Sequence, residues 1–386
     1  MKSIRFGIIG LGLMGREFAS ACARWLHLPN MEVRPEIIAV CDTNIENAEW
    51  FRAICPSVKH VFTSYTDVLS CDDVDAVYCA VPHNLHAKMY CETIRAGKHL
   101  LGEKPFGIDL AANEQINAAI AENPHVLVRC SSQFPFTPAM QYICDMLEGG
   151  AFGRIIEVES GFLHSSDLNP EKPINWKRIL AYNGEYGCMG DLGMHPCHVP
   201  FRAGFIPRNV RAVLSNIVTE RPDASGRRVP CETWDNATLF CETTDPATGG
   251  AFPMTLKMQR IAPGETNTWY FHVRGTEASD RFTTKNINAV EILTYDGSRQ
   301  NWETVEVGHA TAFPSITGGI FEFGFSDAIL QMWAGFLYEL HHGKPIKKFA
   351  GCVTPEEAAL SHRLFTAALK SYASATVEPV SSSPKE

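Results

Sequence analysis

The chain has 386 residues, enough for two or perhaps three domains at about 150 residues each. It is 45% hydrophobic, 20% charged and 10% aromatic, which excludes a disordered, collagen-like or disulfide-scaffold protein. Its 34 lysines and arginines stand against 43 acidic residues, and the net charge of −9 opposes binding to nucleic acid or to an anionic membrane surface.

The first 130 residues alternate apolar, β-branched runs with helical patterns. Strands are predicted at Ile4–Ile9, Ile37–Cys41, Ala76–Cys79, His99–Leu101 and Val126–Val128. Helices are predicted from the first glycines to about Trp25, and at Ile45–Arg52, Leu85–Ala96 and Leu110–Ala121. Continuous apolar strands separated by helices predict a parallel sheet that is covered on both faces.

After residue 130 the pattern changes to mostly strands. A helix is predicted at Pro138–Leu147, and strands at Ile155–Glu159, Val210–Val218, Ala237–Cys241, Met254–Met258 and Tyr270–Val273. Two helices, Asp327–His341 and Pro355–Tyr372, close the chain. The expected fold is therefore α/β, with one domain at 1–130 and a second at 131–386 that contains a large, mostly antiparallel sheet. The last helix, about 355–372, is expected to pack back near the first domain.

Between the first strand and the first helix lies the pattern G-x-G-x-x-G. It is formed by Gly10, Leu11, Gly12, Leu13, Met14 and Gly15. The first glycine would permit a tight turn, the second the close approach of a pyrophosphate, and the third tight packing of helix on strand. The unpaired N–H groups of the helix N-terminus would hold the anion. This predicts a dinucleotide-binding Rossmann domain.

Asp42 ends the second predicted strand, where a carboxylate accepts hydrogen bonds from the adenine ribose hydroxyls and repels a 2′-phosphate. We therefore expect NAD rather than NADP. The alternative is a flexible glycine turn followed by an ordinary surface aspartate.

Two further segments carry groups suited to hydride-transfer chemistry. Lys104, in Glu103-Lys104-Pro105, follows the predicted strand His99–Leu101, and ligands bind at the carboxyl ends of strands in open parallel sheets. Asp191 and His195 are four residues apart, which would place them on one face if the segment is helical. Oxidising an alcohol removes a hydroxyl proton while a hydride leaves carbon, which calls for such groups.

Together these motifs resemble the Gfo/Idh/MocA family, which includes glucose–fructose oxidoreductase, inositol dehydrogenase and rhizopine-catabolism proteins. The resemblance is carried by the glycine loop, residues 80–86, residues 96–105 and Asp191-x-x-x-His195. It implies a Rossmann domain, a C-terminal α/β domain with a large open sheet, a nicotinamide cofactor and sugar or polyol chemistry. It also implies a cis peptide bond between Lys104 and Pro105.

The resemblance also implies roles for individual residues. Lys104 would bind and polarise the reacting hydroxyl, His195 would act as general acid/base, and Asp191 would hold substrate or orient His195. Whether Lys104 or His195 accepts the proton stays open. The further cofactor-binding residues would be Ala80, Pro82, Asn84, His86, Glu103, Lys104 and Trp176. The substrate-binding residues would be Lys104, His164, Arg178, Asp191 and His195.

Two of these assignments have purely structural alternatives, because Asn84 fits a helix cap and Trp176 fits a core position equally well. A metal site near Cys188, His195 and His198 is a further alternative. Their spacing matches no standard zinc pattern, so we expect no metal.

The sequence therefore predicts an NAD-dependent dehydrogenase acting on CH–OH, which oxidises a secondary alcohol of a sugar, sugar acid or cyclitol, or reduces the ketone. Redox-neutral glycoside cleavage with tightly bound NAD and a non-catalytic sugar or nucleotide sensor remain alternatives. A homodimer or homotetramer is expected, because the open sheet offers an apolar face. A cytoplasmic location is expected, because thirteen cysteines form no paired framework and no apolar run is long enough to span a membrane.

Overall fold

The computed structural model describes residues 1–381, which form two compact units. The first unit consists of Met1–Gly107, Ala111–Phe136 and Thr311–Pro355. The second consists of Ile108–Leu110, Thr137–Ala310 and the chain from Glu356 onward. The first unit includes Thr311–Pro355, which lies within the range expected for the second domain, 131–386.

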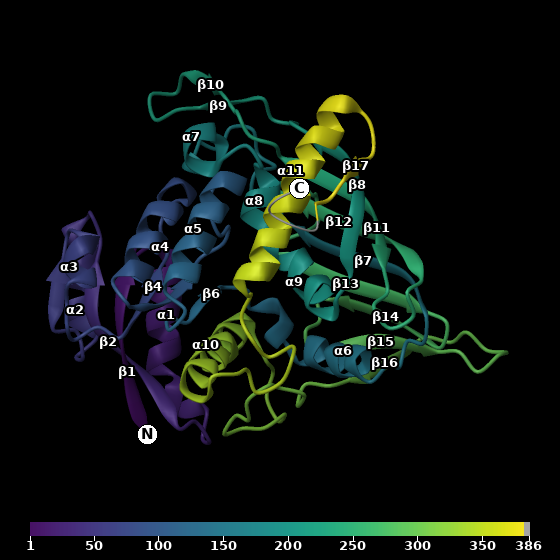
Figure 1. The fold of residues 1–386 in the computed structure, drawn as a ribbon, viewed down its shortest axis with the longest axis horizontal. Helices are drawn as coiled ribbons and strands as arrows, with labels where there is room; N and C mark the ends of the chain where they lie inside the picture. The colour runs from purple at the N-terminus through teal and green to yellow at the C-terminus, as the bar shows by residue number, and fades with distance from the viewer. Residues whose placement is uncertain (382–386) are drawn as a thin grey trace. The chain divides into compact units, whose positions relative to one another are not determined.

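The first unit is built on a six-stranded parallel sheet in the order β3-β2-β1-β4-β5-β6 (Figure 1). Its strands are β1 Lys2–Ile9, β2 Val33–Cys41, β3 His60–Phe62, β4 Ala76–Cys79, β5 His99–Gly102 and β6 Val128–Cys130. Its helices are α1 Leu13–Ala23, α2 Ile45–Ile54, α3 Tyr65–Leu69, α4 His86–Arg95, α5 Leu110–Glu122 and α10 Phe325–His342. This strand order is that of the dinucleotide-binding Rossmann fold, in which the connection reverses direction between β1 and β4.

The carboxyl ends of four neighbouring strands of this sheet are in register. Ile9 of β1 pairs with Cys41 of β2 and with Cys79 of β4, and Cys79 pairs with Gly102 of β5. The residues that follow these strand ends therefore form a row along one edge of the sheet, about 5 Å apart from strand to strand.

Helix α10 comes from far along the chain and packs on the first unit, where Figure 1 shows it beside α1. The ring of Trp333 stacks on Phe18 with centroids 3.7 Å apart and meets Tyr78 edge-on at 4.8 Å. At the other end of the sheet, the Arg129 guanidinium donates two hydrogen bonds to the Glu339 carboxylate, at 3.0 and 2.5 Å. The aromatic burial and this paired charge explain why α10 belongs to the first unit.

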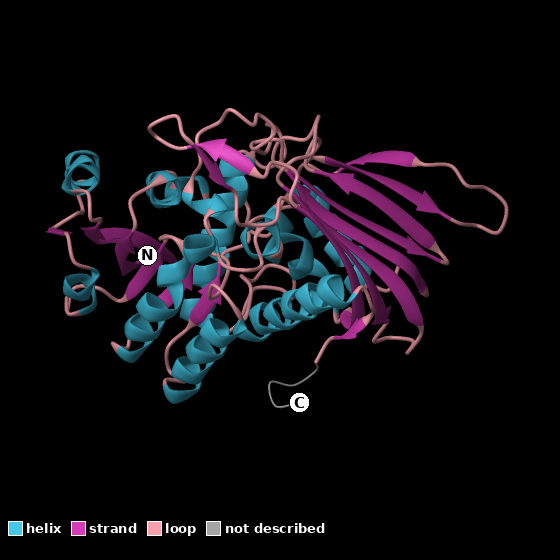
Figure 2. Cartoon of the chain, turned by 90° about the horizontal axis from the view of Figure 1, so that it is seen from above, coloured by secondary structure: helices cyan, strands magenta, loops and turns pink. Residues whose placement is uncertain are grey.

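The second unit is built on a nine-stranded sheet in the order β16-β15-β14-β13-β7-β12-β11-β8-β17, whose strands run side by side in Figure 2. The strands are β7 Ile155–Leu163, β8 Ile206–Ser215, β11 Asn236–Thr244, β12 Ala251–Gln259, β13 Thr268–Gly275, β14 Ala278–Thr283, β15 Ala289–Thr294, β16 Glu303–Glu306 and β17 Glu378–Pro379. All pairings are antiparallel except that of β12 with β7. A separate hairpin pairs β9 Glu220–Pro222 with β10 Arg228–Pro230.

Helices of the second unit cover one face of this sheet. They are α6 Pro138–Glu148, α8 Cys188–Leu192 and α9 Met194–Ala203, which contact the strands directly, and α11 Pro355–Ser374, which bonds to β8 through Ser371. The short helix α7 Leu180–Asn183 instead contacts the turn Trp176–Arg178. On the opposite face the side chains of Val213 and Phe240 are about half exposed, at 49% and 51%. The alternation of buried and exposed positions along the strands follows from this one-sided cover.

Within residues 1–381, the helices lack the combination of length and hydrophobicity that crossing a membrane requires.

Candidate functional site

The glycine loop has the backbone geometry that each of its glycines was expected to provide. Gly10 has a φ of 91°, and a Cβ added there would collide with the carbonyl oxygen of Ala80. A Cβ on Gly15 would lie 2.5 Å from the carbonyl oxygen of Gly10, so only a glycine here allows α1 to start this close to the turn. A Cβ on Gly12 would meet nothing within 4 Å. The loop is therefore packed closely at Gly10 and Gly15 and open at Gly12, as a pyrophosphate at the start of α1 requires.

Asp42 follows the last residue of β2 and fixes the glycine loop. Its carboxylate accepts hydrogen bonds from the backbone N–H of Leu11 and from that of Asn44, both at 2.9 Å. Each carboxylate oxygen keeps further acceptor capacity, because ionised aspartate offers about four lone-pair positions. The residues present thus fit the adenosine half of a dinucleotide.

Glu103 and Lys104 follow the last residue of β5, and the peptide bond between Lys104 and Pro105 is cis, as the family resemblance implied. The side chain of Lys104 is partly exposed. The Tyr78 hydroxyl donates to the Glu103 carboxylate at 2.7 Å, and the Tyr90 hydroxyl donates to the Glu103 backbone carbonyl at 2.7 Å. Burial, followed by the charge of Glu103, raises the pKa of Tyr78 well above its usual value, so this phenol remains a donor.

The imidazole of His86 holds the other end of this turn. Its Nδ1 lies 2.7 Å from the carbonyl oxygen of Pro105 and its Nε2 lies 2.8 Å from that of Val81, while its ring stacks on Tyr90 at 4.8 Å. Burial lowers the pKa of His86, and a neutral ring donates to only one of these two carbonyl oxygens. The buried ring lies between two backbone carbonyls, so the expected contact between His86 and a cofactor is corrected: His86 positions the loop that carries Lys104.

The other expected cofactor residues of the first unit lie around the end of β4. Ala80 directly follows β4, and its carbonyl faces the glycine loop at Gly10. Pro82 is partly exposed, and Asn84 is exposed in the 3₁₀ turn His83–Leu85. Asn84 does not cap α4, because the N-cap residue of that helix is Leu85. Its side chain is therefore available to a ligand.

In the second unit, Asp191 lies in α8 and His195 in the first turn of α9, with Gly193 between the two helices. Both side chains are buried, Asp191 with 1% and His195 with 5% of its surface exposed. The Phe162 ring packs edge-on against His195, with centroids 5.0 Å apart, and against His164 at 4.6 Å. The structure thus brings His164 and His195 onto one phenylalanine at the end of β7.

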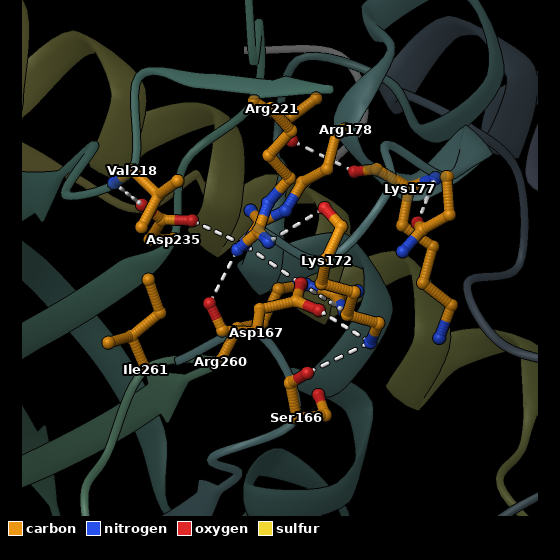
Figure 3. A network of polar contacts seen from close by, with 12 residues as sticks. Ser166, Asp167, Lys172, Lys177, Arg178, Val218, Arg221, Asp235, Arg260 and Ile261 are labelled. Atoms are coloured by element: carbon orange, nitrogen blue, oxygen red, sulfur yellow. Dashed lines mark hydrogen bonds and ion pairs between the residues drawn. The ribbon is translucent and has the colours of Figure 1, made fainter. Parts of the chain in front are cut away.

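The expected role of Arg178 in substrate binding is corrected by a buried ionic network, drawn in Figure 3. Arg178 is completely buried, and its guanidinium lies 2.8 Å from a carboxylate oxygen of Asp167 and 2.5 Å from one of Asp235. Arg178 therefore anchors the turn Trp176–Arg178 to the sheet, and it offers no accessible charge to a ligand.

Two cations that the sequence analysis did not single out hold Asp191. The Lys177 ammonium lies 3.1 Å from one carboxylate oxygen of Asp191, and the buried Arg260 guanidinium hydrogen-bonds to the other. Lys177 is one-third exposed and lies 5.6 Å from the centre of the Trp176 ring, which is half-buried. Asp191 is thus compensated by a buried arginine on one side and a partly exposed lysine on the other.

The rest of the network compensates the charge of Asp167 and holds its loop in place. Burial would raise the pKa of Asp167, but the charges of Arg178, Arg260 and Lys172 lower it below the usual value. The Arg221 guanidinium donates to backbone carbonyls of the same loop, those of Asn169, Lys172 and Asp167. The conformation of this loop therefore depends on the buried guanidinium groups of Arg178 and Arg221.

The alternative metal site near Cys188, His195 and His198 gains no support. Burial raises the pKa of Cys188 to about 12, so its thiol keeps its proton. In residues 1–381, three-residue groups with metal-ligating atoms close together occur elsewhere, at Glu32 with His341 and His342, and at His60 with Cys71 and Asp73.

Comparison with known proteins agrees with this geometry. Residues 4–130 match the family model described as "Oxidoreductase family, NAD-binding Rossmann fold". A levoglucosan dehydrogenase from Pseudarthrobacter phenanthrenivorans is 24% identical over 330 residues, which cover 80% of this chain and 82% of that protein. A glycosyl hydrolase family 109 protein from Shewanella baltica is 30% identical over 183 residues, 42% of this chain and 36% of that protein.

The fold as a whole also has a solved counterpart. A levoglucosan dehydrogenase in complex with NADH and L-sorbose superimposes with a TM-score of 0.87 at 21% sequence identity, covering 99% of this chain and 100% of that one. The α/β fold expected from the sequence is therefore confirmed. Residues 4–130 belong to the Gfo/Idh/MocA family of oxidoreductases and carry its NAD-binding Rossmann fold.

Proposed function

We propose that the protein is an NAD-dependent dehydrogenase that oxidises a secondary alcohol of a sugar, sugar acid or cyclitol, or reduces the corresponding ketone. The observation that carries this proposal is the row of strand ends in the first unit. Asp42, Gly10 and Glu103-Lys104 follow strand ends that are in register, so a cofactor-binding loop and a lysine occupy the same edge of one sheet. Ligands of open parallel sheets bind at that edge.

In this proposal the cofactor, when bound, supplies the hydride acceptor or donor. The pyrophosphate binds at the N-terminus of α1, in the open space beside Gly12. The Asp42 carboxylate accepts hydrogen bonds from the ribose hydroxyls. A 2′-phosphate would be repelled by the same carboxylate, so NAD is favoured over NADP. Ala80, Pro82 and Asn84 offer further contacts near the end of β4.

Lys104 binds and polarises the reacting hydroxyl, and His195 takes the proton, because histidine titrates near neutral pH. Tyr78 and Tyr90 hold Glu103, and His86 lies against the carbonyl of Pro105. These contacts support the role of Lys104, since catalytic groups act best when they are held in place. Asp191 is ion-paired with both Lys177 and Arg260, which fits a group that orients its neighbours better than a proton carrier. With Arg178 buried, Lys177 becomes the cation that the second unit offers to the carboxylate of a sugar acid.

A panel of sugars, sugar acids and inositols tests the proposal, with NAD⁺ as oxidant and the absorbance of NADH as the signal. We expect at least one substrate whose oxidation is lost in Lys104→Met. A protein that binds NADH but turns over no member of the panel would favour a sugar or nucleotide sensor.

A second candidate is redox-neutral glycoside cleavage with NAD retained in the site. The similarity to a glycosyl hydrolase family 109 protein favours keeping it, although that match covers only 42% of this chain. Nitrophenyl glycosides distinguish the two candidates. Release of nitrophenol without accumulation of NADH would support the glycosidase, and NADH formation from a free sugar would support the dehydrogenase.

We further propose that the chain forms a homodimer or homotetramer through the sheet face that carries Val213 and Phe240. Half-exposed apolar side chains on an uncovered sheet face are typical of an interface. Light scattering gives the mass in solution, and Phe240→Glu should shift it toward the monomer.

A further inference from the structure

A group of metal-ligating side chains in the first unit takes no part in the proposed dehydrogenase site. Glu32 directly precedes β2, and His341 and His342 are the last two residues of α10. Nε2 of His341 lies 3.3 Å and Nε2 of His342 lies 3.6 Å from Oε2 of Glu32. One ligand atom from each of the three residues lies within 4.8 Å of the other two. The fold thus gathers two imidazoles and one carboxylate from opposite ends of the sequence.

The spacing of these atoms matches that of ligands around a zinc ion. Zinc binds nitrogen and oxygen at about 2.0–2.2 Å, so two ligands of a tetrahedral site are separated by about 3.4 Å. The two nitrogen–oxygen distances, 3.3 and 3.6 Å, are already close to that value. Little rearrangement is needed, because all three side chains are partly exposed and have room to adjust.

The end of α10 adds a second attraction for a cation. α10 is 18 residues long and is capped by Gly343, which adopts the left-handed conformation with φ of 74°. The carbonyl groups of its last turn carry the negative end of the helix dipole, and cations are stabilised there. His341 and His342 lie in this last turn, so a metal bound to them benefits from the same field.

A cavity next to the group leaves room for a further ligand. It has a volume of about 150 Å³ and is bounded by Glu32 and His342 together with apolar side chains, among them Met31, Phe313 and Tyr338. A zinc ion with three protein ligands keeps its fourth position for water or for an external ligand. The cavity offers that position a partly apolar surrounding.

We propose that Glu32, His341 and His342 form a binding site for a divalent metal ion of the zinc class. Its fourth position is open to water or to a small anionic ligand from the side of the cavity. The site is separate from the proposed dehydrogenase chemistry, which uses none of these residues. Because the ion joins the start of β2 to the end of α10, it also links the first and last segments of the first unit.

The second group, His60 with Cys71 and Asp73, is a weaker candidate for the same ion. Asp73 already pairs with Arg5 at 3.2 Å, and the ammonium of Lys98 donates to the Cys71 carbonyl at 3.0 Å. A metal ion at Asp73 would have to compete with the Arg5 guanidinium, whereas Glu32 contacts the two imidazoles that would themselves ligate the ion.

Equilibrium dialysis of chelator-treated protein against ZnCl₂ at pH 7.5 tests the site without requiring turnover. We expect one ion per chain, and an affinity at least tenfold lower in Glu32→Gln and in His342→Ala. Cobalt(II) serves as a spectroscopic probe, since tetrahedral coordination gives intense visible absorption that both variants should lose. His125→Ala, which removes another exposed histidine of the first unit, is the matched control and should bind as the parent does.

Cys71→Ser distinguishes the two groups. Loss of the ion in Cys71→Ser with full binding in Glu32→Gln would overturn the proposal, and so would equal binding in all variants. Failure of this test leaves the dehydrogenase proposal intact, since NADH formation is measured separately. Circular dichroism of each variant checks that a loss of binding does not reflect unfolding.

Discussion

The Arg260 guanidinium hydrogen-bonds to the carboxylate of Asp191, and both side chains are almost completely buried. Arg260 directly follows β12 and its backbone N–H bonds to the carbonyl of Asp235, so the guanidinium is held by the sheet. The opposite oxygen of Asp191 lies 3.1 Å from the more exposed Lys177. Arg260 thus acts through Asp191 and is a positioning residue in the proposed site.

Replacing Arg260 should reduce turnover without weakening cofactor binding. In Arg260→Met the buried Asp191 loses a hydrogen-bonded cation, and we expect kcat to fall on the order of a hundredfold as Asp191 and Lys177 shift. The fall should appear in kcat more than in KM, and NADH binding measured by fluorescence should be unchanged. Arg260→Lys keeps the charge and should recover part of the rate.

The control for this experiment is Arg274→Met. Arg274 pairs with Glu157 and Glu159 on the exposed side of the sheet and is 47% exposed, so its loss should leave the rate within a factor of about two. Equal losses in both variants would indicate general destabilisation, and an unchanged rate in Arg260→Met would remove Arg260 from the mechanism.

Lys104→Met should lower turnover by on the order of a thousandfold while NAD binding stays nearly intact. The reason is that Lys104 contacts the reacting oxygen in the proposed mechanism, whereas the glycine loop and Asp42 hold the adenosine half of the cofactor. His195→Ala should have a similar effect and should flatten the pH dependence of alcohol oxidation. Asp191→Asn should cause a milder loss. Near parental rates in both Lys104→Met and His195→Ala would contradict the mechanism.

Asp42→Ala should narrow the preference for NAD over NADP. The carboxylate that repels a 2′-phosphate is lost, but so are its hydrogen bonds to Leu11 and Asn44, and NAD binding should therefore weaken as well. Calorimetric titration with both dinucleotides measures the two affinities. Arg16, which lies 4.6 Å over the Trp50 ring, is the nearby cation that a 2′-phosphate would meet if the parent chain preferred NADP.

Dehydrogenase activity should survive EDTA, because the proposed chemistry uses no metal and Cys188 keeps its proton. This expectation holds even where the Glu32 group binds zinc, since none of its residues takes part in the reaction. The measurement is the initial rate before and after dialysis against chelator. A loss of turnover that zinc restores would contradict the metal-free mechanism.

The first half of the fold and its cofactor loop could be predicted from the sequence because their signals are local. The glycine motif and Asp42 mark the dinucleotide-binding edge by their positions after predicted strands alone, and the structure has those strands. The missed elements β3 and α3 contain only three and five residues, too short for a periodic pattern. The strand predicted at Val210–Val218 in fact spans Ile206–Ser215, because the N–H groups of Ile217 and Val218 bond to the Asp235 carboxylate and leave the sheet.

The substrate half of the site was less predictable because it depends on partners that are distant in the chain. From the sequence, Arg178 is expected to be an accessible charge. Its burial depends on its ion pairs with Asp167 and Asp235, which are distant in the chain. Arg260 follows an ordinary strand and gives no motif of its own. Its role emerges only once β12 and α8 pack together.

Asp280→Asn should stabilise the protein at neutral and alkaline pH. Asp280 is completely buried in β14, and Oδ1 accepts a hydrogen bond from the Val273 N–H at 2.8 Å. Burial raises its pKa well above the value of the unfolded chain, so the folded state binds the proton more tightly. Stability contributed by this group is therefore full below about pH 4 and is lost as the pH rises toward the folded-state pKa.

The asparagine keeps the acceptor for Val273 and removes the ionisable group, so the difference between variant and parent should grow from pH 4 to pH 8. Thermal unfolding measures it, at about 2–4 °C for each kcal/mol gained. Asp296→Asn is a control of opposite sign. Hydrogen bonds from Arg299 and Ser298 lower the pKa of Asp296, so its contribution is present at neutral pH and is lost as the pH falls through the folded-state pKa. A parallel response of the two variants to pH would contradict the assignment of a buried, proton-retaining carboxyl at Asp280.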